Sequence, residues 1–167
     1  MTGVQTCALP IYDENNNTIA HYTTEPELYG RVISQDRGGE VRHYKYDGQG
    51  NTVALTDNSG NVTDTRKYSA FGEVTESTGT TEFPYQWWGL CGAMYDVSRT
   101  YLRHRFLDEF TSRWLCADPL GISPDEINAF AIAKNNVVNH RDPSGLQIPV
   151  PLPRFCPQFV PKFTPRI

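Results

Sequence analysis

Residues 40–61 read EVRHYKYDGQGNTVALTDNSGN, and this stretch decides the fold. Its first seven residues alternate so that Tyr44 and Tyr46 fall on one face, a pattern typical of a β-strand. Residues 47–51 form a strong turn signal, because Gly adopts positive φ and Asp or Asn bonds its own backbone. A return strand follows, and residues 57–61 repeat the turn signal. The stretch therefore predicts antiparallel hairpins.

The same rhythm continues in both directions from this stretch. Turns recur about every 10 to 12 residues, at Gly50, Gly60 and Gly72, and this spacing predicts repeated hairpins. Upstream, residues 12–40 are polar and are interpreted as a start and a partial repeat. We therefore expect a mainly β fold built from antiparallel hairpins.

The composition agrees with strands joined by tight turns. Aromatic residues make up 12% of the 167 residues, and Gly and Pro number 13 and 12, which favours strands and turns over helices. A net charge of −4 offers no basic surface for nucleic acid. No apolar run approaches the roughly 20 residues of a membrane helix. We expect one modest domain with no nucleic-acid partner and no membrane span.

The cysteines and histidines predict neither a metal site nor a cofactor site. The four cysteines have no CxxC spacing, so neither a zinc site nor a dense disulfide framework is predicted. His43, His104 and His140 lie far apart in the sequence, which disfavours a metal site or a Ser/His/Asp arrangement. We therefore expect no cofactor and no metal.

The first eleven residues, MTGVQTCALPI, look like a translated sequencing-library adapter. They have no sustained periodicity, no basic n-region and no long apolar run, so they do not form a signal peptide. We expect residues 1–11 to be a non-native leader and the native chain to start near Tyr12. The true N-terminus then lies upstream, and the absence of a targeting signal carries no information.

A short helix is predicted over residues 124–134. Ser123 is a suitable N-cap, Pro124 suits the first helical position, and Glu126 completes a capping box. Apolar residues then recur at helical spacing on one side.

The composition changes abruptly after Leu146. Residues 147–167 hold six of the twelve prolines, and such a segment favours polyproline or irregular structure over a sheet or a helix. We expect a domain boundary here.

Several motifs resemble the RHS-repeat-associated core domain of proteins also called YD-repeat or rearrangement-hotspot proteins. Residues 44–51 look like a complete YD-repeat turn, and residues 94–108 resemble the aromatic stretch that follows the repeats. Residues 113–121, 135–139 and 142–146 are similar to the terminal block of the family.

The chain departs from the family pattern at two places. Arg99-Thr100 stands where Gly-Leu is usual, and Glu109 stands where Pro is usual. These changes weaken the tight turn expected before Tyr101 and leave the aromatic strand itself intact.

The resemblance covers residues 41–146, which would be the core domain, and it implies a shell. Its hairpins would form part of a β-shell wall around a variable C-terminal cargo, often a toxin. In that family the chain is cut after the Leu that corresponds to Leu146, so Leu146–Gln147 is the expected cleavage site. Residues 147–167 would then be a truncated cargo, or an end that carries none. The resemblance also implies a bacterial parent, secreted or at the cell surface, whose partners are its own cargo and secretion machinery.

The resemblance further implies an aspartyl-type autoprotease that acts only on its own chain. The motifs assign its carboxylates to Asp118 and Asp142. Two acids held close cannot both ionise easily, so one can take a proton from water while the other donates to the developing oxyanion. Arg113 is a candidate to steady a carboxylate. Asp125 is a second candidate for the pair, and the sequence leaves open which acid faces Leu146.

The border segment also has a purely structural interpretation. Asp142-Pro143-Ser144-Gly145 has the residue preferences of a type I β-turn. The two interpretations are compatible, because a rigid turn presents the next peptide bond at a fixed place.

A rival function is that of a non-enzymatic cell-surface or wall-associated YD-repeat protein in which Leu146 is never cut. In that case Trp87 and Trp88 would be candidates for binding carbohydrate by stacking. Packing within the wall is the favoured role for these two residues, because aromatic side chains dominate buried strand faces.

Overall fold

The structure is a computed structural model that describes residues 7–26, 29–96, 98–121, 128–146 and 150–151. The first sheet contains β1 (Cys7–Tyr12), β2 (Thr18–Thr24), β3 (Val32–Arg37), β4 (Glu40–Tyr46), β5 (Thr52–Thr56), β6 (Val62–Tyr68) and β7 (Val74–Thr78). The second sheet contains β8 (Met94–Asp96), β9 (Arg99–Leu102), β10 (Arg105–Asp108) and β11 (Arg113–Trp114). The short strands β12 (His140–Arg141) and β13 (Val150–Pro151) form a pair, and two 3-10 turns are η1 (Gly89–Cys91) and η2 (Ala133–Asn135).

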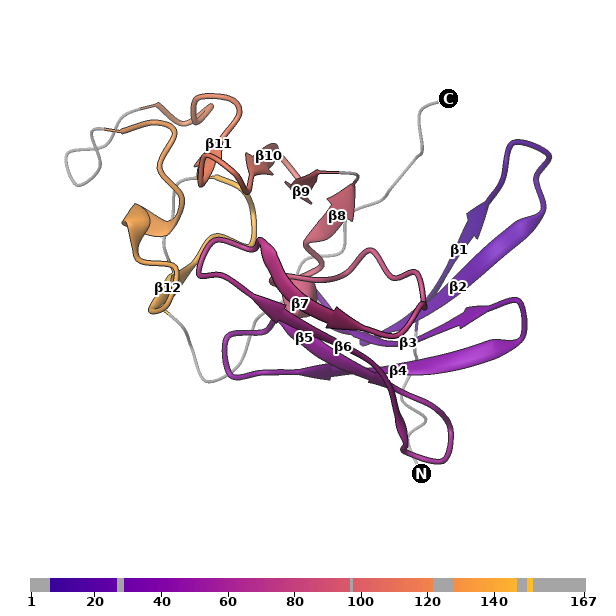
Figure 1. Cartoon of the computed structure of the whole chain (residues 1–167). Helices are drawn as coiled ribbons and strands as arrows, with labels where there is room; N and C mark the ends of the chain where they lie inside the picture. The colour runs from indigo at the N-terminus through magenta and orange to yellow at the C-terminus, as the bar shows by residue number, and fades with distance from the viewer. Residues whose placement is uncertain (1–6, 27–28, 97, 122–127, 147–149, 152–167) are drawn as a thin grey trace.

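The first sheet is an antiparallel meander whose seven strands lie side by side in chain order. It twists and fans out along its length (Figure 1). The predicted hairpins are therefore confirmed, and so is the mainly β fold. Within the described residues, no helix is long and apolar enough to cross a bilayer.

Three turns of the meander share one hydrogen-bond pattern, and they begin at Asp13, Asp47 and Asp57. Oδ1 of each aspartate accepts the backbone N–H groups two and four residues later, at 2.8–2.9 Å. Oδ2 accepts the side-chain amide of the asparagine that ends the turn, at 2.9–3.0 Å. The aspartate side chains therefore bind backbone N–H groups of the turn that have no partner in the neighbouring strand. This is why the motif fixes the hairpin.

The fourth residue of each of these turns has a positive φ. The angle is 83° at Gly50 and 86° at Gly60, where glycine adopts it without strain. Asn16 takes the same position in the first turn with a φ of 62°. Asparagine is one of the few other residues that tolerate this region, so the first turn keeps the geometry without a glycine.

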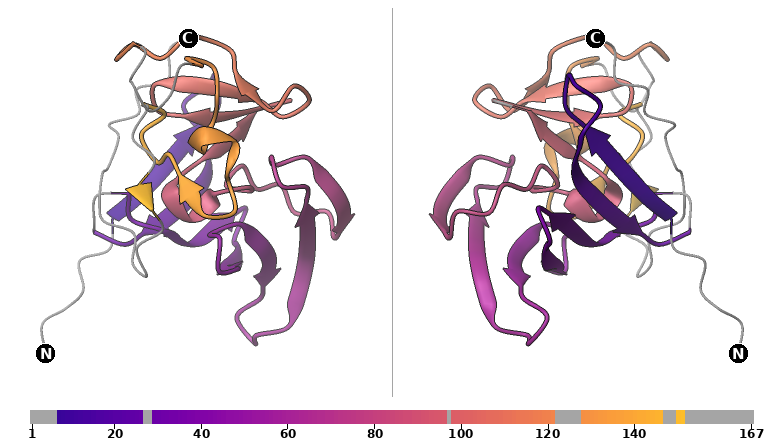
Figure 2. Two further views of the ribbon diagram at one scale, coloured as in Figure 1. Left: turned by 90° about the vertical axis from the view of Figure 1, so that its left-hand side faces the viewer. Right: turned by 90° about the vertical axis from the view of Figure 1, so that its right-hand side faces the viewer.

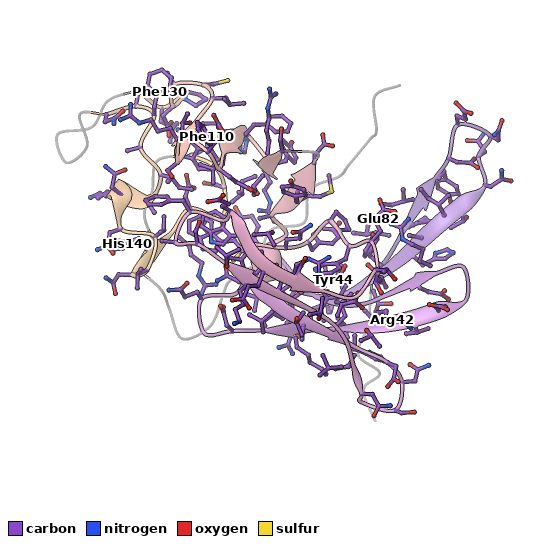
Figure 3. The ribbon with its side chains drawn as sticks, in the orientation of Figure 1. Arg42, Tyr44, Glu82, Phe110, Phe130 and His140 are labelled. Atoms are coloured by element: carbon purple, nitrogen blue, oxygen red, sulfur yellow. The ribbon has the colours of Figure 1, made fainter. Side chains whose placement is uncertain are left out.

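One face of the meander carries an aromatic core. Its buried residues are Ala20, Tyr22, Val32, Tyr44, Leu55 and Phe83. The Tyr44 hydroxyl donates to Gln35 Oε1 at 2.7 Å, and Gln35 Nε2 donates to the Glu82 carbonyl at 3.0 Å. Figure 3 shows Tyr44 and Glu82 near each other over the sheet. The chain that leaves β7 is therefore tied back across the strands that precede it.

A second core joins the two sheets. It contains Trp87, Trp88, Ala93, Leu102, Leu107, Trp114, Ile132, Ala133 and Val137. The rings of Trp87 and Trp88 stack at a centroid distance of 4.1 Å, and both side chains are buried. Their position supports the wall-packing interpretation, because neither indole has a face open for a sugar. The turn η1 lies between the sheets (Figures 1 and 2).

The helix predicted over 124–134 is wrong for the part that the structure describes. Residues 128–132 form turns and extended backbone, and η2 consists of residues with positive φ, including 54° at Lys134. The carbonyl of Ala129 accepts the Asp118 N–H at 3.0 Å, and that of Phe130 accepts the Trp114 N–H at 3.0 Å. These two carbonyls therefore accept hydrogen bonds from distant residues and not from the backbone N–H groups of a helix. Residues 124–127 lie outside the described residues.

Part of the expected leader belongs to the first sheet. Residues 7–11 form most of β1, which pairs with β2 from Cys7↔Thr24 to Ile11↔Ala20. Ile11 packs against the aromatic core. The absence of periodicity therefore did not separate this stretch from the domain. Its non-native origin stays a prediction.

Candidate functional site

The border turn spans Asp142 to Leu146 and is closed by its own side chains. The Asp142 carbonyl accepts the Gly145 N–H at 3.3 Å, as the turn preferences predict. Asp142 Oδ1 accepts the Ser144 hydroxyl at 2.9 Å and the Leu146 N–H at 3.1 Å. The residue before the expected cleavage site is thus held directly by one of the two expected carboxylates.

Gly145 lets this turn pack against the second sheet. Its φ is 71°, and a Cβ there would lie 2.3 Å from the Leu102 carbonyl oxygen and 3.3 Å from the Arg105 backbone nitrogen. A glycine is therefore needed for both conformation and space.

One buried guanidinium joins the two expected carboxylates. Arg105 Nη2 lies 2.7 Å from Asp118 Oδ2 and 3.2 Å from Asp142 Oδ2. The three side chains are at most 3% exposed. Burying charges costs several kcal/mol per ion unless they are paired and hydrogen-bonded, so this triad depends on all its members. The structure brings Asp118 and Asp142 together, although 24 positions separate them in the sequence.

Strand geometry explains why Arg105 points inward. Arg105 and Leu107 share a face of β10, and Leu107 lies in the second core. The Arg105 guanidinium also lies over the Trp114 ring, 4.3 Å from its centroid, and Nη1 donates to the Ala129 carbonyl at 3.2 Å. Asp118 in turn accepts the Leu120 N–H at 2.8 Å. The packing of β10 thus fixes the position of the guanidinium that contacts both carboxylates.

Burial controls the protonation of Asp142. Removal from water raises the pKa of its carboxyl to about 6, although the Ser144 hydroxyl and the Arg105 charge act in the opposite direction. A carboxyl with this pKa exchanges its proton under mildly acidic conditions. Such a group can serve as an acid where an ordinary aspartate cannot.

The other site residues expected from the sequence are placed as follows. Arg113 is exposed on β11, and the arginine between the carboxylates is Arg105. Asp125 and Gln147 lie outside the described residues. Sequence reasoning missed Arg105, although the alternation from Arg105 to Leu107 signals that a charged residue points into the core.

Comparisons with known proteins agree with the repeat pattern. Residues 29–62 match the family model described as RHS Repeat. The tRNA3(Ser)-specific nuclease WapA of Bacillus spizizenii is 28% identical over 138 residues, which cover 80% of this chain and 6% of that protein.

Solved structures share the fold. The crystal structure of TcdB2-TccC3-TEV superimposes with a TM-score of 0.65 at 18% identity, covering 83% of this chain and 7% of the other. That of TcdB2-TccC3 without its hypervariable C-terminal region gives a TM-score of 0.64 at 18% identity, over 83% and 7%. This chain therefore spans a small part of the length of the proteins it resembles.

Proposed function

We propose that the chain is the C-terminal part of a shell that encloses a C-terminal cargo. The match of residues 29–62 to the RHS Repeat model and the 28% identity to the WapA nuclease over 138 residues support this proposal. The shell frees this cargo by cutting its own chain after Leu146. The parent protein is bacterial, acts outside the cell that makes it, and has its own cargo as its partner.

The observation that carries this proposal is the shared contact of Asp118 and Asp142 with Arg105 Nη2, beside the border turn. Asp142 binds the Leu146 N–H through its other oxygen. One acid of the pair thus touches the residue whose carbonyl would react. A purely structural Asp-Pro turn requires neither a buried second acid nor a buried arginine.

The proposed reaction is hydrolysis of the Leu146–Gln147 bond. Asp118, which makes the shorter contact with the Arg105 guanidinium, takes a proton from a water molecule whose oxygen adds to the Leu146 carbonyl carbon. Asp142, with its pKa raised to about 6, lends its proton to the developing oxyanion and recovers it later. The bond to the Gln147 nitrogen then breaks, and that nitrogen takes the proton that came from water. The products are a Leu146 carboxylate and a free amino group on Gln147.

The test is the intact mass of the purified 167-residue chain beside two variants, Asp118→Asn and Asp142→Asn. Each substitution removes a titratable proton while it keeps the shape of the side chain. The wild type is expected to split at Leu146–Gln147, and both variants are expected to stay whole.

Asp96→Asn is the matched control, because Asp96 is exposed at the end of β8 and far along the chain from the border. It is expected to cut like the wild type. Cleavage that persists in both Asp118→Asn and Asp142→Asn would sink the carboxylate mechanism. A cut at another bond would sink the assignment of Leu146.

A further inference from the structure

Three consecutive side chains, two from the turn between β9 and β10 and one from the start of β10, contact three consecutive carbonyls of the border turn. Arg103 Nη1 donates to the Pro143 carbonyl, and Arg105 Nε donates to the Gly145 carbonyl. Between them, His104 Nδ1 lies 2.9 Å from the Ser144 carbonyl oxygen. A carbonyl only accepts, so Nδ1 carries the proton in this contact. We call Arg103, His104 and Arg105 the carbonyl clamp.

The backbone conformation of the turn between β9 and β10 determines the direction in which the clamp side chains point. Arg103 has a φ of 47°, which turns the chain sharply between the two strands. In a regular strand, successive side chains would point to opposite faces. The left-handed residue breaks that alternation and lets neighbouring side chains reach the same segment.

Arg103 also ties the border turn to the rest of the protein. Its Nη2 donates to the Cys91 carbonyl of η1 at 2.7 Å. Its guanidinium carbon lies 4.0 Å from the centroid of the Tyr29 ring, which precedes β3. The border turn, η1 and the connection between β2 and β3 therefore meet at one side chain, and a shift of the border turn would have to break these contacts.

We infer that Arg103 and His104 are positioning residues that hold the border turn in the geometry required for the cut after Leu146. This inference rests on the proposed function. Neither residue is placed at the reacting atoms. They fix the carbonyls that lead up to the cut, and holding a reacting group in a productive geometry is worth large factors in rate.

The clamp stops one residue before the bond to be cut. The next carbonyl, that of Leu146, lies 3.2 Å from the neutral Ser144 hydroxyl, whose single proton is shared with Asp142 Oδ1 at 2.9 Å. The charged guanidinium contacts thus fall on Pro143 and Gly145, which fix the approach of the chain. The carbonyl that must gain negative charge in the reaction faces a weaker donor in the resting state.

His104 allows a clean test, because its side chain is exposed and its loss leaves the core intact. His104→Leu keeps a similar volume without a donor, and His104→Asn keeps an N–H donor close to the position of Nδ1. Removing one such hydrogen bond is expected to slow cleavage roughly five- to tenfold. His104→Asn is expected to restore most of the rate.

Arg103→Met is expected to be slower than His104→Leu, because it removes contacts to two carbonyls. Arg99→Met is its matched control, since Arg99 is exposed at the start of β9, the strand that leads into Arg103. In the Arg103 and His104 variants, the pH at which the cleavage rate is half-maximal is expected to stay where it is in the wild type. A moved midpoint would mean that the variants alter the titration of the acids, and it would overturn a positioning role.

Amide hydrogen exchange gives a second readout that does not need cleavage, because every clamp contact lies before the cut. His104→Leu is expected to speed exchange at Gly145 and Leu146 and to leave the strands of the first sheet unchanged. Unchanged exchange at both amides would overturn the clamp. Faster exchange in a chain whose wild type is never cut would support the clamp and defeat the proposed cleavage, so the two failures are distinguishable.

Discussion

Gly145 carries the tightest steric constraint of the border turn. Gly145→Ala is expected to destabilise the protein by more than about 1 kcal/mol, because it adds a backbone penalty at positive φ to a clash with the Leu102 carbonyl. The change is read as a shift in the urea midpoint. Gly121→Ala is the control, because Gly121 has a φ of 83° but no atom within 4 Å of an added Cβ. Equal losses in the two variants would contradict the close packing of the border turn.

Asp142 gives the protein a pH dependence with a definite sign. Its folded pKa of about 6 lies above the ordinary value of 3.8, so the folded chain binds this proton more tightly than the unfolded chain. The group's contribution to stability is therefore fully present below pH about 4 and is lost as the pH rises to about 6. Asp142→Asn is expected to remove this loss. The urea midpoint of the wild type should fall relative to that of Asp142→Asn as the pH rises across that range. Parallel curves would contradict the raised pKa.

At the residue level, the acids of the site were easier to predict than the group that joins them. Asp118 and Asp142 stand in motifs, each before a proline, and the family resemblance assigned them. Arg105 lies in an aromatic strand where an arginine looks like a surface residue. Only its burial beside Trp114 and between two acids shows its place, and that depends on packing between segments distant in the sequence.

The hairpin turns depend on their first aspartate. The side-chain amide of Asn61, followed by backbone N–H groups, lowers the pKa of Asp57. The lowered value means that the ionised carboxylate stabilises the fold above pH about 3.8, and that this contribution is lost as the pH falls through the folded pKa. Asp57→Ala is expected to lower the thermal midpoint at neutral pH and to differ less from the wild type in acid.

Ser59→Ala is the control for this turn, because only the backbone N–H of Ser59 binds the aspartate. It is expected to leave the midpoint unchanged at both pH values. An Asp57→Ala variant as stable as Ser59→Ala at neutral pH would contradict the role of the side chain in the turn.

At the level of elements, local signals predicted the hairpins and failed where tertiary contacts decide. Each turn satisfies its own hydrogen bonds within five residues, so its sequence is enough. Residues 128–134 carry helix-like spacing, but the carbonyls of residues 129 and 130 bind Asp118, Trp114 and Arg105 instead. Residues 7–11 show no strand pattern and still pair with β2, because an edge strand can be recruited by backbone hydrogen bonds alone.

At the scale of the whole molecule, the second sheet, the segment that follows it and the border turn meet around one buried triad. The meander follows from turn chemistry that repeats along the sequence, so its architecture could be predicted. The way the second sheet turns Arg105 toward Asp118 and Asp142 could not, because it depends on how β10 packs against Trp114 and the border turn. Exposed aromatic residues such as Phe110 and Phe130 lie at the outer end of this second sheet (Figure 3).

The central claim is that this triad cuts the chain after Leu146. The most direct measurement is a time course of intact mass for the 167-residue chain at pH about 5 to 6, carried out in water enriched in heavy oxygen. Hydrolysis is expected to yield a fragment that ends at Leu146 and carries one heavy oxygen, beside a fragment that begins at Gln147. A wild-type chain that stays whole throughout, as Asp142→Asn is expected to do, would contradict the account.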